Sequence, residues 1–202
     1  MKGKYKNICG VILAGGKCSR YEGKNKAFLQ VKDVTFYNKT TRLLENIFEE
    51  VIVITNHSDD FPNDNIPKYQ DIRKNIGPLG GIHSALSNTK STDAIFIVAI
   101  DMPFLNEDVI RKMLEAYTQQ EVDILIPIIG NNIEPLSAIY SINILEKLNE
   151  YLNTTNNFSI RSFFKIVNTK FFELETNVFN KKSFININSQ DDYDKYINPS
   201  IF

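Results

Sequence analysis

The sequence predicts an α/β protein of the Rossmann-like, three-layer α/β/α type, with a mostly parallel central sheet and an antiparallel addition at one edge. Short β-branched runs alternate with segments in which apolar residues recur at helical spacing. Runs that are apolar throughout, such as Ala94–Ile100, are typical of parallel strands that are covered on both faces. A late group of short strand-like runs predicts the antiparallel addition at the edge.

The first half of the chain supplies the strands expected at the centre of the sheet. These are the apolar or β-branched runs Ile8–Leu13, Val51–Thr55 and Ala94–Ile100. Phe36–Glu50 has the apolar spacing of a helix, and the polar residues 56–65 predict a loop. Gly77–Gly81 (GPLGG) predicts a second glycine-rich turn, with a helix over Ile82–Ser87 behind it.

The second half continues the alternation and ends in an acidic segment. Asn106 predicts a helix N-cap, with two acidic residues in the first turn of a helix that runs to about Tyr117. The run Asp191–Asp194 predicts the polar first turn of a terminal helix rather than a metal site. Further strands are expected at Asp123–Ile129, Pro135–Tyr140, Phe171–Glu175 and Phe184–Ile187, and further helices at Ile144–Tyr151 and Ile160–Ile166.

Length and composition restrict the class of protein. The 202 residues predict one domain, 1–202, with 43% hydrophobic and 23% charged residues. A formal net charge of −1 argues against bulk nucleic-acid or membrane binding. No stretch approaches the ~20 apolar residues that span a bilayer, so we expect a cytoplasmic protein. Cys9 and Cys18 fit no zinc spacing and no disulfide framework, which predicts reduced thiols.

The glycine turn after the first strand predicts a polyphosphate site. Gly15 and Gly16 let the backbone approach a bound group, and cations follow at Lys17, Arg20, Lys24 and Lys26. Arg20 offers a fork that matches phosphate oxygens, and Lys26 offers a point charge. The segment is neither the dinucleotide fingerprint nor the P-loop. The alternative is a plain strand-to-helix turn, with Lys17 and Lys24 as surface charges.

Polar residues at the ends of the predicted strands form a second set of candidates, because ligands of such sheets bind there. Asp101 follows seven apolar residues and is a candidate ligand of Mg²⁺, or alternatively a cap of the following turn. Asp71 and the GPLGG segment are candidates for contact with a base or ribose, or else form a simple connector. Asn56 either recognises a base edge or shapes its own turn. His57 and His83 lack a nucleophile pattern and are predicted to be surface or packing residues.

Several of these motifs together resemble those of a known enzyme group. LAGG at Leu13–Gly16, Ser19-Arg20, Gly23-x-x-Lys26, GPLGGI at Gly77–Ile82 and AIDMPFL at Ala99–Leu105 resemble nucleotidyltransferases with the sugar-nucleotide pyrophosphorylase type of fold. Later segments resemble the molybdenum cofactor guanylyltransferase family within that group. These are Glu134–Tyr140 (EPLSAIY), Ile160–Phe164 (IRSFF) and Phe184–Asn188 (FININ). The family pattern places Met and Gly directly after the arginine, whereas here Tyr21-Glu22 precede Gly23, which lengthens the loop by about one residue.

The resemblance implies transfer of GMP from GTP to the terminal phosphate of molybdopterin or molybdenum-molybdopterin, with release of pyrophosphate. It implies that Arg20, Lys26 and Asp101 are catalytic and that Asp101 holds Mg²⁺ as the cofactor. Asn186 and Asn188 would face the pterin. Other cofactor-biosynthesis proteins and molybdoenzyme-specific chaperones are possible partners. The nucleotide contacts that it implies are Leu13, Ala14, Gly15, Gly16, Lys26, Asn56, Asp71, Gly80 and Asp101.

Three other functions are compatible with the same residues. A cytidylyltransferase would act on the same cofactor with CTP, and a sugar- or alditol-phosphate nucleotidyltransferase would use another phosphate as nucleophile. A carrier that binds a nucleotide or the cofactor without catalysis is an alternative of a different class. Retention of Arg20, Lys26 and Asp101 argues against the carrier.

Overall fold

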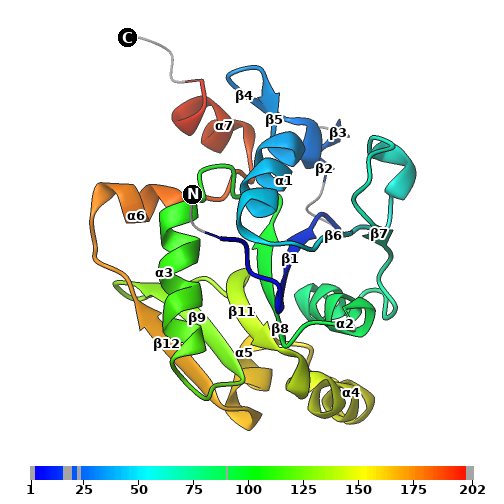
Figure 1. The fold of residues 1–202 in the computed structure, drawn as a ribbon. Coiled ribbons are helices and arrows are strands. Elements are labelled where there is room, and N and C mark those ends of the chain that lie inside the picture. Colours follow the sequence, from blue (N-terminus) through cyan, green and yellow to red (C-terminus); the bar gives the residue numbers. More distant parts are fainter. Residues whose placement is uncertain (1–2, 16–19, 22–23, 90, 199–202) are drawn as a thin grey trace.

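A central sheet of eight strands organises the protein (Figure 1). The computed structural model describes residues 3–15, 20–21, 24–89 and 91–198. The strand order is β10-β9-β11-β8-β1-β6-β7, and β12 pairs with β9. The strands of this sheet are β1 (Ile8–Leu13), β6 (Val51–Ile54), β7 (Lys68–Tyr69), β8 (Ala94–Ala99), β9 (Ile124–Ile129), β10 (Asn132–Ile133), β11 (Ser137–Ser141) and β12 (Thr169–Glu173).

The parallel centre of the sheet places the expected strand ends beside one another. β1 lies between β6 and β8 and pairs with both in parallel, so that Leu13 is opposite Ile54 on one side and Ala99 on the other. The amide of Ile100 donates to the carbonyl of Leu13 at 3.0 Å, which extends this alignment beyond the strands. The prediction of three buried parallel strands that end at one edge of the sheet is confirmed.

The antiparallel contribution lies partly inside the sheet. β11 is antiparallel to both β8 and β9, whereas β10 forms a short antiparallel pair with β9 at the edge. The last strand, β12, pairs in parallel with β9, so the antiparallel pairs come from β10 and β11. The predicted strand Phe184–Ile187 is also wrong, because the amide of Ile187 donates to the carbonyl of Asp101 rather than to a neighbouring strand.

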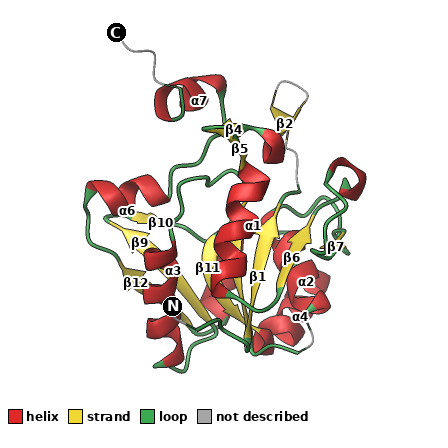
Figure 2. Cartoon of the chain, turned by 45° about the horizontal axis from the view of Figure 1, so that its top comes forward, coloured by secondary structure: helices red, strands yellow, loops and turns green. Residues whose placement is uncertain are grey.

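Helices cover the two faces of the sheet and bury two apolar cores (Figure 2). One core includes side chains from α1 (Phe36–Ile47) and α3 (Glu107–Thr118). The other includes side chains from α2 (Pro78–Asn88), α4 (Leu145–Thr154) and α5 (Ile160–Phe163). The three-layer arrangement is therefore confirmed, and the Asn106 side chain caps α3 as predicted.

Pro78–Gly81, the last four residues of GPLGG, form the start of a helix, so the prediction of a turn there is wrong. Gly77 has a φ of +67° and precedes α2, and Pro78 occupies the first turn, where its missing amide hydrogen costs little. A Cβ on Gly80 would lie 2.7 Å from the carbonyl oxygen of Arg73, and one on Gly81 would lie 3.2 Å from the Leu13 side chain. The two glycines therefore allow α2 to pack closely against the end of β1 and the preceding loop.

Small elements surround the carboxyl ends of the strands. β2 (Arg20–Tyr21) pairs with β3 (Lys24–Asn25), and β4 (Gln30–Val31) pairs with β5 (Val34–Thr35). The 3₁₀ segments are η2 (Lys26–Phe28), η3 (Ser58–Asp60), η4 (Ile142–Ile144) and η5 (Phe164–Ile166). Near the C-terminus, α6 (Val178–Ser183) was not predicted, whereas α7 (Gln190–Tyr196) was. None of the helices in the described ranges is long and apolar enough to cross a membrane.

Candidate active site

Lys26, Asp101 and Asn188 meet at the carboxyl ends of the central strands, although they are far apart in the sequence. The Lys26 ammonium donates to Asn188 Oδ1 at 2.9 Å and lies 3.8 Å from Asp101 Oδ2. Its side chain is only 2% exposed. Burying an ammonium is unfavourable unless an anion and hydrogen-bond acceptors compensate for the lost water, and these two neighbours do so.

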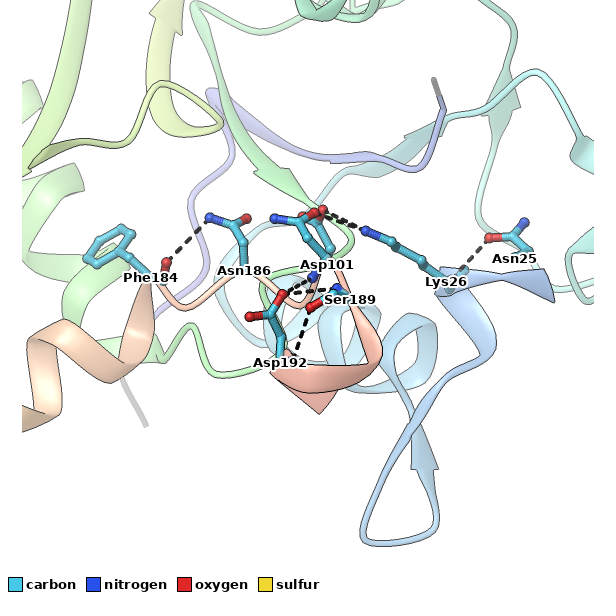
Figure 3. Close-up of polar contacts among 9 residues, drawn as sticks. Asn25, Lys26, Asp101, Phe184, Asn186, Ser189 and Asp192 are labelled. Carbon is cyan, nitrogen blue, oxygen red and sulfur yellow. Dashed lines mark hydrogen bonds and ion pairs between the residues drawn. The ribbon is translucent and has the colours of Figure 1, made fainter. Parts of the chain in front are cut away.

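Local hydrogen bonds position the lysine. The Asn25 side chain accepts from the amide of Ala27 at 3.0 Å and thereby caps η2, the short segment that begins at Lys26. Ala27 is fully buried in the core, which fixes the segment against the sheet. The lysine therefore leaves a supported turn and points toward Asp101 (Figure 3).

The segment before α7 positions Asn188. Asp192 Oδ2 accepts from the amides of Asn188 and Ser189 at 3.0 and 2.9 Å. The Ser189 hydroxyl accepts in return from the amide of Asp192, which completes a capping box at the start of α7. The amides of Asn188 and Ser189 lower the pKa of Asp192. The FININ segment thus brings a C-terminal side chain to a lysine of the N-terminal region.

Asp101 has one carboxylate oxygen without a partner. Its side chain is 19% exposed, and within the described part of the chain the buried Oδ1 atom has no hydrogen-bond donor. Burial raises the pKa of Asp101, while the charge of Lys26 opposes this rise. A buried carboxylate with a free oxygen is suited to a bound cation, because Mg²⁺ prefers oxygen ligands.

Asn56 and Asp71 are held together beside Gly15. The Asn56 amide group donates to Asp71 Oδ2 at 2.7 Å, and its Oδ1 accepts from the backbone amide of Asp71 at 3.1 Å. A Cβ on Gly15 would lie 3.8 Å from both side chains. Asp71 is only partly exposed and also lies near Gly81 of α2. The structure therefore unites three of the predicted nucleotide contacts in one place.

Other predicted residues have different positions. The amide of Ala14 donates to the carbonyl of Ile54 at 2.9 Å, so this amide is already paired within the structure. Gly80 lies within α2 and packs against the backbone of Arg73, which precedes that helix. The expectations for Gly16, Lys17, Cys18, Ser19 and Gly23 lie outside the described residues, as do those for the side chains of Arg20 and Lys24.

The sequence analysis did not select Glu134 as a site residue. It lines a cavity of about 230 Å³ together with Pro78, Met102, Pro135, Leu136, Ile160 and Asn186. Burial raises the pKa of Glu134 to about 7, and the negative charge of Asp101 adds to this rise. Its position at the start of EPLSAIY was visible in the sequence, but its proximity to Asp101 depends on the pairing of β11 with β8. Asn186 lines the same cavity.

His83 is a packing residue, as predicted. It is 4% exposed within α2, and its Nε2 lies 2.8 Å from Asn149 Oδ1, whereas Nδ1 has no partner in the described structure. Nε2 is therefore assigned the proton that it donates to Asn149. Burial lowers the pKa of His83.

The buried imidazole predicts a loss of stability in mild acid. Because the pKa of His83 is lowered in the folded state, the unfolded chain takes up this proton at a higher pH than the folded chain as the pH falls below about 6.5. The free energy of unfolding should then decrease, by no more than about 1.4 kcal/mol per pH unit from this group. Urea unfolding of the parent and His83→Gln between pH 7.5 and 5.5 measures the difference. Equal pH slopes for the two proteins would contradict the prediction.

The fold and the paired lysine and aspartate at its strand ends define an α/β nucleotidyltransferase domain. A family model described as the MobA-like NTP transferase domain matches residues 10–170. The chain belongs to the MobA-like NTP transferase family.

Individual proteins of similar sequence have names that agree with this family. The chain is 35% identical over 190 residues to a probable molybdenum cofactor guanylyltransferase of Clostridium perfringens, covering 92% of this chain and 94% of that protein. It is 33% identical to the molybdenum cofactor guanylyltransferase of Syntrophotalea carbinolica, covering 92% and 89% of the two chains. The crystal structure of molybdopterin-guanine dinucleotide biosynthesis protein A from Archaeoglobus fulgidus has the same fold, with a TM-score of 0.75, 21% identity, and coverage of 94% and 96%.

Proposed function

We propose that the protein transfers GMP from GTP to the terminal phosphate of molybdopterin or molybdenum-molybdopterin, which forms the guanine dinucleotide cofactor and releases pyrophosphate. The observation that carries this proposal is the joining of Lys26, Asp101 and Asn188 at the strand ends. The names of relatives that are 33% and 35% identical to this chain over the aligned residues supply the substrates. In the reaction, a phosphate oxygen of molybdopterin forms a bond to the α-phosphorus of GTP, and the bond from that phosphorus to pyrophosphate breaks.

The chain's own residues bind and orient the triphosphate of GTP and the terminal phosphate of molybdopterin. Lys26 offsets the charge of the triphosphate, and its rigid, buried stem fixes the place of that charge. Asn56 holds Asp71 beside Gly15, where the pair is placed to contact the nucleoside. Asn186 faces the cavity on the other side of Asp101 and is assigned to the second substrate. A phosphate nucleophile is already ionised at neutral pH, so no general base is required.

Mg²⁺ is the expected cofactor, and the donor set fits it. Asp101 supplies a carboxylate whose buried Oδ1 lacks a protein donor, and phosphate oxygens and water would complete the set of ligands. When bound, Mg²⁺ would neutralise charge on the phosphates as the bond to pyrophosphate breaks. Arg20 is assigned to the leaving pyrophosphate on the basis of its place in the family motif.

Titration with four nucleotides tests the choice of base. GTP with Mg²⁺ should raise the melting temperature more than CTP, ATP or UTP, because a ligand that binds only the folded state stabilises it by RT ln(1 + [L]/Kd). At a concentration of about 100 Kd this amounts to roughly 2.7 kcal/mol. Pyrophosphate release in the presence of molybdopterin then tests the reaction. Preference for CTP would indicate a cytidylyltransferase, and GTP binding without pyrophosphate release would indicate a carrier.

A further inference from the structure

The segment that leads into α7 is attached to both sides of the candidate active site. The amide of Ile187 donates to the carbonyl of Asp101 at 2.9 Å, and the Ile187 side chain is fully buried in the core. In α7 itself, the Tyr193 hydroxyl donates at 2.8 Å to the carbonyl of Gln30, in the strand that follows η2. The segment is therefore fastened to the end of β8 that precedes Asp101 and to the part of the chain that carries Lys26.

Asn188 lies between these two attachments, and hydrogen bonds rather than packing hold it. The residue is exposed, so burial does not fix its side chain. Its backbone amide donates to Asp192 Oδ2 at 3.0 Å, and its side-chain oxygen accepts from the buried Lys26 ammonium at 2.9 Å. Because the amide of Ile187 is bonded as well, backbone groups on both sides set the direction of the Asn188 side chain. Asp192 is thereby connected to Lys26 through a single residue.

A helix cap alone does not account for both hydrogen bonds that Asp192 accepts. The capping box of α7 requires one bond, from the amide of the N-cap residue Ser189 to the Asp192 carboxylate, and this bond is 2.9 Å long. The second bond comes from the residue before the cap, which is the residue that contacts Lys26 (Figure 3). The acidic run Asp191–Asp194 therefore includes one carboxylate that supports a site residue as well as the helix.

We propose that Asp192 is a positioning residue for Lys26 and acts through Asn188. A lysine side chain is long and flexible, so an ammonium that is already held in place is ordered at less cost when a ligand binds. Lysine has three N–H donors, which allows Lys26 to contact a phosphate without leaving Asn188. The consequence for GTP rests on the proposed function, in which Lys26 is assigned to the triphosphate.

Chemical labelling of lysine amines tests the positioning without an activity measurement. Trace acetic anhydride acetylates accessible amines, and mass spectrometry of the digested protein gives the rate at each lysine. Lys26 is 2% exposed and should react about tenfold faster in Asp192→Ala than in the parent, because loss of the hydrogen bonds makes local opening more frequent. Asp192→Asn keeps a side-chain oxygen that accepts from amides and should retain most of the protection. Asp191→Ala removes the neighbouring exposed carboxylate from the same turn and should react as the parent does.

Lys68 is the internal control for a general loosening of the protein. Its side chain is 12% exposed and pairs with Asp64, and it lies in β7 at the edge of the sheet. The rate at Lys68 should be the same in Asp192→Ala and in the parent. Unchanged labelling of Lys26 in Asp192→Ala, or equal increases at Lys26 and Lys68, would overturn the proposal.

A double-mutant cycle tests the consequence for GTP. Asp192→Ala should weaken GTP binding by about three- to tenfold in the parent background and leave it unchanged in Lys26→Met, because the carboxylate acts only through that lysine. A role confined to the stability of α7 would weaken binding equally in both backgrounds, and this result would overturn the proposal. A parent that binds no GTP, yet protects Lys26 through Asp192, would instead refute the proposed function and leave the positioning role intact.

Discussion

Replacement of Asp101 by asparagine is expected to slow pyrophosphate release by roughly 10³-fold under saturating GTP and molybdopterin. The asparagine keeps the shape of the side chain and one oxygen, but it removes the negative charge that a cation requires. Stabilisation of developing charge by a bound metal contributes several kcal/mol, and each 1.4 kcal/mol corresponds to about tenfold in rate. The measurement is a coupled pyrophosphate assay over a range of Mg²⁺ concentrations.

Two controls separate this effect from a loss of folding. Asp101→Asn loses the ion pair with Lys26, which destabilises the fold, but it also removes a buried charged group that has an unpaired oxygen, which stabilises the fold. Because these effects oppose each other, the melting temperature should change by no more than about 4 °C. Asp108→Asn removes an exposed carboxylate from the first turn of α3 and should retain parental activity. Turnover of Asp101→Asn at the parental rate would exclude Asp101 as the metal ligand.

The central strands and the positions of their ends could be predicted from the sequence because the signal is local. Apolar runs such as Ala94–Ile100 have few alternatives to a buried parallel strand, and the polar residue after each run must lie near the edge of the sheet. The N-cap at Asn106 and the acidic first turn of α7 are equally local, since each concerns hydrogen bonds within a few residues.

The errors arose where long-range contacts override the local pattern. Gly80 and Gly81 read as a turn, yet they lie in α2, where a Cβ would collide with the Arg73 carbonyl at Gly80 and crowd the Leu13 side chain at Gly81. Phe184–Ile187 has the composition of a strand, but its backbone bonds to Asp101 and so supports the site rather than the sheet. Glu134 was missed because only the pairing of β11 with β8 brings it near Asp101. The local sequence pattern of these segments contains no information about such long-range contacts.

The link between Lys26 and Asn188 shows how the two ends of the chain cooperate. The glycine turn alone predicts a phosphate site, and FININ alone carries only a family resemblance. In the structure, the Asn188 side chain accepts from the ammonium that the N-terminal segment contributes. The C-terminal segment therefore helps to hold Lys26, the lysine that we propose contacts the phosphates, in addition to the contact with the pterin that the resemblance implies for Asn188.

Replacement of Lys26 by methionine should weaken GTP binding by about 10–100-fold. Met matches the length of the aliphatic part of lysine and fills the buried space that it occupies, but it has no positive charge to interact with the triphosphate. A hydrogen bond to a charged group contributes about 1.5–3 kcal/mol, which sets the expected range. Calorimetric titration with GTP and Mg²⁺ measures the loss. Lys147→Met changes an exposed lysine of α4 and should bind GTP as the parent does.

The same variant has a second expected effect, which distinguishes a phosphate ligand from a residue that only supports the fold. Without Lys26, Asp101 loses its nearby cation and Asn188 loses its donor, so the metal-free protein should be destabilised. Added Mg²⁺ would compensate for the charge on Asp101 and restore part of the melting temperature, but it cannot restore the contact with GTP. If added Mg²⁺ restores GTP affinity as well as stability, the phosphate contact belongs to another cation that follows the glycine turn, such as Lys24.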